Sequence, residues 1–329
     1  MAILGQTVLR ECRHPEPVQR DGQSQGLWDA PYTPTRGPAQ LNSDQLKNVL
    51  AEEQRIMDEF APVYDAAMIT NSYVYSLERK RFVKWLTGLA AEAGELSEMS
   101  VLDAGCASGG VLELMSGAGF GQLTGLDLSP KMLEVARGRE LPRTEFLRGT
   151  IEHAPFQGQI FDVIVAAFTV HHLCEPSAFF KLVDNTLKPG GYFFVLEYDI
   201  DSGTIGLAGD GPRRRIGDTV RGLFAWKNRR TLAAKPPLVG QFNSAHRMMS
   251  FANLCDAMPN PDDYKVTHDS HGFVLPAFLP VLVEESAIDR GIVKVADAID
   301  RRLKRSRTGL FQWVAGRRVT RQNHVQARS

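Results

Sequence analysis

A short stretch between residues 101 and 110 combines a carboxylate with a run of small residues. The apolar residues Val101 and Leu102 are followed by Asp103, and the turn after them reads Ala-Gly-Cys-Ala-Ser-Gly-Gly. An apolar pattern at helical spacing begins directly after the turn, so we predict a buried strand, a tight turn and a helix start. Small residues let a backbone approach a ligand closely, and a helix N-terminus offers free N–H groups. The stretch therefore predicts a ligand site at the end of a strand.

The charge of Asp103 indicates what kind of ligand the turn binds. A dinucleotide-binding turn has three glycines and faces a pyrophosphate, whereas this turn has the pattern Gly105-x-Ala107-x-Gly109. A carboxylate at the strand end would repel a phosphate and attract a ligand with an ammonium and a sulfonium, such as S-adenosylmethionine. On these residues the sequence resembles the class I S-adenosylmethionine-dependent methyltransferases, whose first motif is an acidic residue followed by a glycine-rich turn.

A second carboxylate follows at a spacing that recurs in nucleoside-binding folds. Residues 122–127 predict a strand that ends in Asp127, 22 residues after Gly105, and Pro130 begins a helix. A carboxylate at the tip of the second strand can accept hydrogen bonds from both ribose hydroxyls, and its alternative role is to cap the following helix. The other predicted cofactor contacts near these motifs and the fourth strand are Cys106, Leu128, Met132 and Phe168.

The third strand, over residues 145–148, leads into a turn at which the chain departs from the family pattern. In the resembling family an aspartate follows the glycine and bonds the adenine amino group. Thr150 occupies that place here, and we expect its hydroxyl to accept this hydrogen bond. The resemblance also implies that the backbone N–H of Ile151 contacts the adenine ring.

The fourth strand, over residues 161–168, runs into a pair of histidines. Open α/β sheets bind ligands at this edge, and neighbouring side chains point to opposite faces, so one histidine is expected to reach the site. A neutral imidazole could take a proton from the methyl acceptor, which makes His171 and His172 the candidate catalytic residues. The alternative is that they pack beside the methionine part of the cofactor. A Leu-Lys-Pro-Gly-Gly turn before the fifth strand extends the resemblance to about residue 199.

Helices before and after this core are predicted to cover it. An amphipathic helix capped by Ser43 and ended by Pro62, and a second over residues 76–92, precede the core. The resemblance implies a lid over the methionine end of the cofactor. A basic segment after the core predicts either an anionic substrate or a solvated helix face. The predicted substrate and lid residues are Tyr64, Tyr73, Arg213, Arg214, Arg215 and Trp226.

These elements predict an α/β fold with a doubly wound, Rossmann-like, seven-stranded and mostly parallel sheet. N-terminal helices and a helical cap insertion accompany it. Further helices are expected over 244–258 and 284–305, with strands at 264–268 and 310–315, the last one antiparallel. The predicted divisions are an extended or disordered arm (1–41), a helical lid (42–98), the S-adenosylmethionine-binding core (99–200), a basic cap (201–243) and the C-terminal completion of the core (244–329).

Composition adds constraints on compartment and partners. The 38 basic and 38 acidic residues balance overall, but residues 201–329 hold 21 basic and 12 acidic side chains. The four cysteines form no C-x-x-C pair, so we expect neither a metal site nor a disulfide framework, and a cytoplasmic protein. No apolar stretch approaches the ~20 residues of a membrane span.

The predicted activity is methyl transfer from S-adenosylmethionine to the O, N or C of a small molecule, anionic or apolar, and the elaborated cap favours a role in specialised metabolism. Two alternatives stay open: a nucleic-acid methyltransferase, which the basic second half favours, and a protein that binds the cofactor without catalysis. A nucleic-acid partner is disfavoured because the fourth strand ends in Ala-Phe-Thr-Val-His-His rather than an Asn/Asp-Pro-Pro-aromatic turn. A homodimer is compatible with the sequence.

Overall fold

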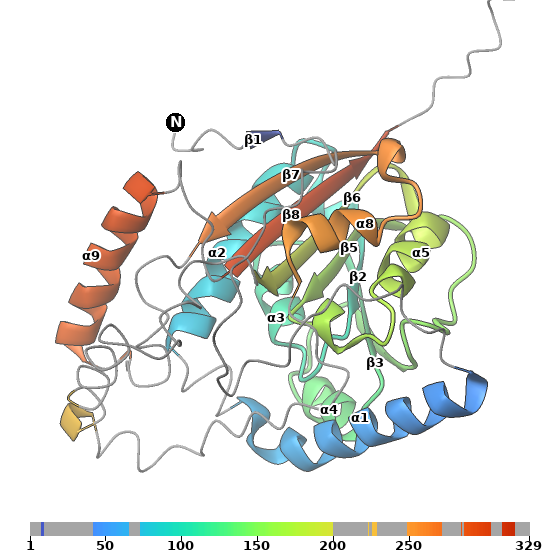
Figure 1. Cartoon of the computed structure of the whole chain (residues 1–329), viewed down its shortest axis with the longest axis horizontal. Helices are drawn as coiled ribbons and strands as arrows, with labels where there is room; N and C mark the ends of the chain where they lie inside the picture. The colour runs from blue at the N-terminus through green and yellow to red at the C-terminus, as the bar shows by residue number, and fades with distance from the viewer. Residues whose placement is uncertain are drawn as a thin grey trace, which may run out of the picture.

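The computed structural model describes residues 8–9, 42–65, 73–199, 223, 226–228, 249–271, 284, 286–303 and 311–319. Within these ranges helices cover both faces of an eight-stranded sheet (Figure 1). The elements in chain order are β1 (Val8–Leu9), α1 (Ser43–Tyr64), α2 (Tyr73–Ala90), η2 (Leu96–Glu98), β2 (Ser100–Ala104), α3 (Gly110–Gly117), β3 (Gln122–Asp127), α4 (Pro130–Arg137), β4 (Thr144–Arg148), β5 (Phe161–Ala167), η3 (Val170–His172), α5 (Ser177–Thr186), β6 (Leu187–Tyr198), α8 (Phe251–Asp256), η5 (Pro261–Asp263), β7 (Tyr264–His271), α9 (Ala287–Leu303) and β8 (Phe311–Arg318).

The sheet has the order β1-β7-β8-β6-β5-β2-β3-β4. The strands β4, β3, β2, β5 and β6 are parallel, and β8 is antiparallel to both of its neighbours, β6 and β7. The predicted doubly wound, seven-stranded sheet is confirmed, and the two-residue strand β1 adds an eighth by pairing with β7. Strand order reverses between β2 and β5, the place where open α/β sheets bind their ligands.

Two apolar clusters, one on each face, hold the helices to the sheet. Side chains alternate along a strand, so Val101 lies in the cluster that contains α2 and α3 residues, whereas Leu102 lies in the cluster of α5 and α8. Phe194 and Phe193 divide in the same way on β6. This burial on both faces explains why the parallel strands read as continuous apolar runs.

The first helix differs from its predicted bounds at both ends. Asn42, not Ser43, is the N-cap: its side chain accepts from the backbone N–H groups of Asp44 and Gln45, and the Gln45 side chain accepts from the N–H of Asn42. This reciprocal capping box stabilises a start one residue earlier than predicted. Pro62 lies within the last turn, and the helix continues to Tyr64.

Three further expectations are corrected in the second half of the chain. The α8 helix begins at Phe251 rather than at residue 244, because the Ser250 hydroxyl accepts the N–H of Asn253 as an N-cap. The β6 strand begins at Leu187 and takes in the turn predicted to precede it. Cys255 forms a disulfide, contrary to the expectation of reduced thiols, whereas Cys106 and Cys174 are free.

Candidate functional site

The turn after β2 has a backbone that favours glycine. Gly105 and Gly109 have φ angles of 79° and 80°, in the left-handed region. A Cβ atom at Gly105 would lie 2.3 Å from Cγ2 of Thr169, so no side chain fits there. Ala107 also has a positive φ, 46°, and its N–H donates to Oδ2 of Asp127 at 2.8 Å. The tip of β3 therefore holds the turn that follows β2.

Asp103 is an almost completely buried carboxylate at the end of β2. It is 1% exposed, and its Oδ2 atom makes no hydrogen bond with any residue that the structure describes. Burial, reinforced by the negative charge of Asp127, raises the pKa of Asp103 to about 7, and Arg79 acts in the opposite direction. A buried acceptor without a donor is costly. A cationic donor, such as the ammonium group of S-adenosylmethionine, fits this position chemically.

Asp127 at the end of β3 is held in place by two backbone donors. The N–H of Ser129 donates to Oδ1 and that of Ala107 to Oδ2, each at 2.8 Å. Burial raises the pKa of Asp127 to about 6, although both hydrogen bonds act to lower it. A carboxylate offers about four acceptor positions, so these two bonds leave capacity for two hydroxyl donors. Its predicted alternative as the cap of α4 is wrong, because Ser129 is that N-cap.

Three other predicted cofactor residues lie close to these carboxylates in the chain and are buried or partly buried. Leu128 is partly buried between Asp127 and Ser129, Cys106 is 5% exposed, and Met132 is fully buried in α4. Burial raises the pKa of the Cys106 thiol well above its ordinary value, so this cysteine is a packing residue rather than a nucleophile.

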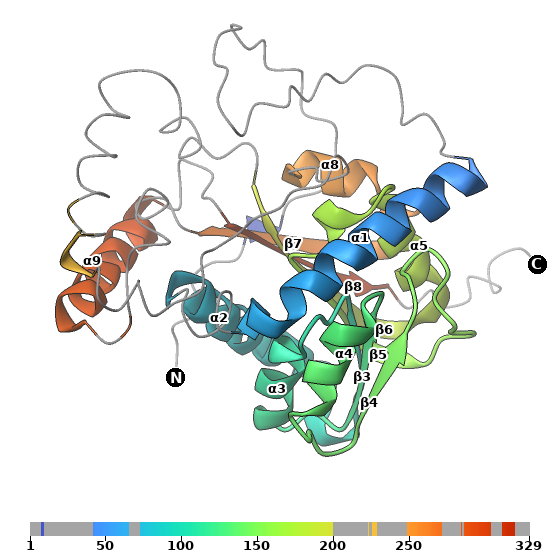
Figure 2. The ribbon, with the colours of Figure 1, turned by 90° about the horizontal axis from the view of Figure 1, so that it is seen from below.

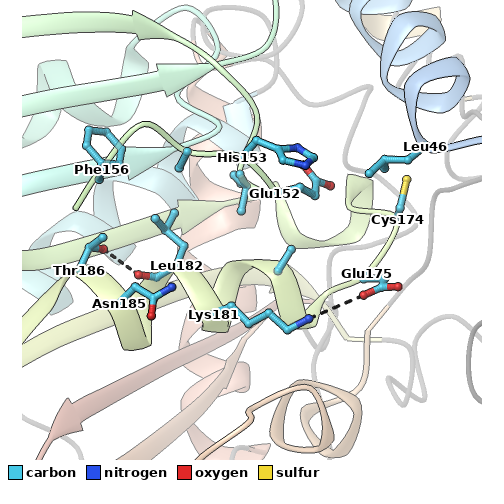
Figure 3. Close-up of a pocket in the computed structure, with 13 residues that line it drawn as sticks. Leu46, Glu152, His153, Phe156, Cys174, Glu175, Lys181, Leu182, Asn185 and Thr186 are labelled. Atoms are coloured by element: carbon cyan, nitrogen blue, oxygen red, sulfur yellow. Dashed lines mark hydrogen bonds and ion pairs between the residues drawn. The ribbon is translucent and has the colours of Figure 1, made fainter. Parts of the chain in front are cut away.

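A cavity of about 280 Å³ borders Ile151, between the segment after β4 and helix α5 (Figure 3). Leu46 of α1 and Cys174 line one end of it. Thr150 lies directly before Ile151, and its Oγ1 accepts from the N–H of His153 at 3.2 Å. Ile151 therefore borders a cavity and is also buried in the apolar cluster of α5 and α8, whereas Thr150 is not among the residues that line the cavity.

The two predicted catalytic histidines lie in η3, and each is oriented by a buried glutamate. Nδ1 of His171 lies 2.7 Å from Oε2 of Glu197 on β6, and Nδ1 of His172 lies 2.7 Å from Oε1 of Glu53 on α1. An ionised carboxylate only accepts, so each Nδ1 is the donor to its glutamate, and in the neutral imidazole the lone pair is then on Nε2. The imidazole rings are 4.2 Å apart. Burial, with the neighbouring His171, lowers the pKa of His172.

Phe168 joins the ends of β5 and β6 to the lid helices. Its φ of 55° is unusual for an aromatic residue, and its N–H donates to the carbonyl of Leu196 at 2.7 Å. Its ring lies 5.0 Å from that of Tyr198 and 6.0 Å from the guanidinium carbon of Arg79 on α2. Tyr198 in turn lies 5.8 Å from the ring of His171. An aromatic wall thus runs from α2 to the histidine pair.

The predicted lid and substrate residues are only partly brought to this site. Burial raises the pKa of Tyr64, and the charges that act on it include Arg79 and Asp103. Trp226 is 63% exposed, and its neighbour Lys227 forms an ion pair with Asp289 of α9. The side chain of Tyr73 and the arginines 213, 214 and 215 lie outside the described residues.

Helix α1 crosses the carboxyl edge of the sheet and contacts three elements of the site (Figure 2). Beside the pair with His172, Asp58 accepts from the Ser129 hydroxyl at 2.5 Å. Asp65, directly after α1, lies 2.5 Å from Arg139, which also donates to the carbonyl of Ser108 in the glycine-rich turn. We call the contacts of Glu53, Asp58 and Asp65 the α1 latches.

Sequence reasoning missed the residues that orient this site, although two of them carry a signal. Glu197 stands inside the apolar run of residues 192–198, and a charge in such a strand requires a buried partner. Glu53 lies three residues before Ile56, on the apolar face of α1, where a carboxylate is out of pattern. Arg79 carries no comparable signal, because basic residues are common in its helix.

Comparison with known proteins agrees with this geometry. Residues 102–195 match the family model of a methyltransferase domain. Demethylmenaquinone methyltransferase of Chlorobaculum tepidum is 26% identical over 241 residues, 71% of this chain and 89% of that protein. Ubiquinone biosynthesis O-methyltransferase of Yersinia pestis is 33% identical over 113 residues, 33% of this chain and 46% of that protein. The solved structure of Haemonchus contortus Phospholethanolamine N-methyltransferase 2 shares the fold, with a TM-score of 0.52, 14% identity and coverage of 82% of this chain and 59% of that one.

The sheet order, the glycine-rich turn and the family match define a class I S-adenosylmethionine-dependent methyltransferase. The protein is an enzyme of that class that methylates a small molecule, with S-adenosylmethionine as the methyl donor. Among the described helices, none has both the length and the apolar character needed to cross a membrane.

Proposed function

We propose that Asp103 and Asp127 bind opposite ends of S-adenosylmethionine. The buried, unpaired Oδ2 of Asp103 carries this proposal, because the ammonium of the methionine end supplies the missing donor. Asp127 accepts the ribose hydroxyls, while the turn from Gly105 to Gly109 lets the backbone approach the ligand. The bound cofactor supplies an electrophilic methyl group on a sulfonium.

His171 is the proposed general base, and Glu197 is its positioning residue. The bond from Nδ1 to Glu197 selects the tautomer with a basic Nε2 and stabilises the imidazolium that forms when the acceptor loses its proton. His172 has the same arrangement with Glu53, and burial lowers its pKa, which makes it a weaker base than an ordinary imidazole. The protein otherwise aligns the acceptor and excludes water, and alignment alone corresponds to effective molarities of ~10⁵ M or more.

The proposed acceptor is a small organic molecule with an ionisable O–H or C–H group beside a planar ring. The relatives named above are methyltransferases of demethylmenaquinone and of ubiquinone biosynthesis, and the wall of Phe168 and Tyr198 suits a flat ring. The anionic acceptor stays a prediction, because the arginines 213, 214 and 215 lie outside the described residues. The homodimer also stays a prediction. The cytoplasmic location also stays a prediction, and the disulfide at Cys255 counts against it.

The test is incubation of the full-length protein with a cell extract and deuteromethyl-labelled S-adenosylmethionine, followed by mass spectrometry. The expected result is a labelled small molecule whose formation depends on the protein. Label in RNA or DNA instead would support a nucleic-acid methyltransferase. Cofactor binding without label in any fraction would support a binding protein without catalysis.

A further inference from the structure

Helix α9 presents a stripe of large apolar side chains to solvent. Ile288, Val295 and Ile299 are 61%, 61% and 40% exposed. Their spacing of seven and four residues places them on one side of the helix. Val293 and Ala296 lie on another side and are buried in the apolar cluster that contains α2 residues. The fold therefore anchors α9 by one face and leaves a second apolar face in contact with solvent.

A short segment beside the start of α9 adds an exposed tryptophan to this surface. Lys227 forms an ion pair with Asp289, and its Nζ also donates to the Ser286 hydroxyl at 2.9 Å. These contacts hold Trp226, which is 63% exposed, next to the helix. Figures 1 and 2 show α9 at the outer edge of the molecule. The apolar stripe is the side of an outlying helix rather than a pocket, so it suits an extended surface better than a small molecule.

Basic residues accompany the apolar stripe. Arg290 and Lys294 are exposed and lie four residues apart, on one side of α9. Of the acidic residues of the helix, Asp289 is buried and paired with Lys227. The sequence from 301 to 329, which begins in the last turn of α9, has nine basic and no acidic residues. A helix with one apolar and one basic side is typical of segments that lie in the headgroup region of a membrane, and basic clusters beside such a helix attract anionic lipids.

We propose that α9 docks the protein on the surface of a bilayer that contains anionic lipids. Ile288, Val295 and Ile299 enter the boundary between headgroups and acyl chains, and Arg290 and Lys294 contact the headgroups. Trp226 belongs at the same boundary, where tryptophan is enriched. A second copy of the chain suits the stripe less well, because three side chains fall short of the about 800 Å² per partner of a stable interface. The proposal concerns a surface outside the proposed cofactor site and does not depend on the methyl acceptor.

The test is co-flotation of the full-length protein with vesicles of equimolar phosphatidylcholine and phosphatidylglycerol, and with vesicles of phosphatidylcholine alone. The protein should bind the mixed vesicles more tightly, and added salt should weaken that binding. Val295→Asp combined with Ile299→Asp should weaken binding to the mixed vesicles at least tenfold, because both charges would enter the apolar boundary. Lys294→Glu should weaken binding to the mixed vesicles and leave binding to phosphatidylcholine unchanged.

A matched control makes the same charge change outside α9. Ile160 and Val319 are 42% and 39% exposed, so Ile160→Asp combined with Val319→Asp should change vesicle binding much less than the α9 double variant. Urea unfolding checks that both double variants are folded. Equal weakening by the two double variants, or a wild type that binds neither vesicle, overturns the proposal. If the wild type binds neither vesicle, a mass that doubles with protein concentration and falls in the α9 double variant assigns the stripe to a second copy instead.

Discussion

At the scale of single residues, the site depends on carboxylates that the fold keeps out of water. Asp103 and Glu197 are buried and Asp127 is partly buried, and each lies at or near the end of a strand. Burial raises the pKa of Asp103 against the charge of Arg79 and that of Asp127 against two backbone hydrogen bonds, so the protein without ligand bears an electrostatic cost. A cationic ligand would reduce that cost, which supports the proposed cofactor site.

The first prediction concerns the pH dependence that Asp103 imposes. A folded-state pKa of about 7, above an unfolded value of about 3.9, means that the folded protein holds the proton more tightly. The stability of the unliganded protein should therefore fall as pH rises from about 4 through 7. Affinity for S-adenosylmethionine should rise over the same range, because its ammonium favours the ionised carboxylate.

Denaturant titrations measure how the free energy of unfolding changes with pH, and calorimetry measures how the affinity for S-adenosylmethionine changes over the same range. In Asp103→Asn the contribution of Asp103 to both pH dependences should disappear. Cofactor affinity should be low at every pH. A wild-type affinity that does not change between pH 5 and 8 would contradict the role of this carboxylate.

The second prediction separates the two histidines. With the acceptor identified by labelling, His171→Gln should lower kcat by ~10²-fold or more and remove the acidic limb of the pH profile. Glu197→Gln should also lower kcat, because His171 can then adopt the tautomer without a lone pair on Nε2. Its effect on the acceptor KM should be smaller. His172→Gln is the matched control on the neighbouring position. Wild-type kcat and the same limb in both histidine variants would show that neither side chain moves a proton.

The carboxylates proposed to bind the ligand were easier to predict than the glutamates that orient the two histidines. Asp103 and Asp127 stand at strand ends next to turn motifs, so short-range patterns are enough to find them. The partners of the histidines are 26 and 119 residues distant in the chain, and only the three-dimensional fold brings them within 2.7 Å. The cavity beside Ile151 depends on α5 and α1 together, and no local pattern encodes it.

At the scale of elements, α1 is an amphipathic helix whose inward face carries acids as well as apolar residues. Ile56 and Ala61 are buried, and Glu53 and Asp58 lie on the side that contacts the sheet edge. Its apolar face was predictable from helical spacing, whereas its N-cap was missed by one residue because Asn42 and Ser43 are both good capping residues. Which element the acids contact depends on the fold and could not be predicted.

The third prediction tests the α1 latches through Asp58. Burial acts to raise the pKa of this carboxyl, but hydrogen bonds from Ser129, Lys131 and Gln54 outweigh burial, and the pKa is lowered overall. Asp58→Ala should destabilise the protein by about 1.5–3 kcal/mol in urea unfolding near neutral pH. The loss should shrink as pH falls below about 4, because a carboxyl with a lowered folded-state pKa stabilises only while ionised.

Hydrogen exchange locates the effect of that change. Amides of α1 should exchange faster in Asp58→Ala, while those of β2 and β5 keep their protection. Asp44→Ala is the control on the same helix, because its ion pair with Lys47 is 77% and 90% exposed and contributes little. Equal stability of Asp58→Ala and the wild type would show that α1 is held by its apolar face alone.

At the scale of the whole molecule, β8 completes a sheet that begins more than 200 residues earlier. It lies between β6 and β7 and is antiparallel to both. Strand types and the parallel core were predictable because apolar runs and turns alternate along residues 99–199. Neither the β1 strand nor its pairing with β7 was predictable, since two residues carry no periodic pattern. The predicted basic cap lies mostly outside the described residues.

The fourth prediction tests how tightly β8 fits. A Cβ atom at Gly316 would lie 2.1 Å from the ring of Phe193, which is fully buried on β6. Gly316→Ala should therefore destabilise the fold by about 1–3 kcal/mol in denaturant titrations. Gly291→Ala in α9 is the matched control, since nothing lies within 4 Å of its Cβ position, and it should stabilise by about 0.5–1 kcal/mol. Equal effects of the two changes would contradict the close approach of β8 and β6.

The position of α1 has a kinetic consequence for the proposed enzyme. The helix is bonded to η3, to the start of α4 and, through Arg139, to the glycine-rich turn, so it covers the edge of the sheet beside the proposed cofactor site. If the cofactor enters and leaves past this helix, its exchange requires these contacts to break. The frequency of that opening sets a ceiling on turnover that is the same for every acceptor, however reactive its nucleophile.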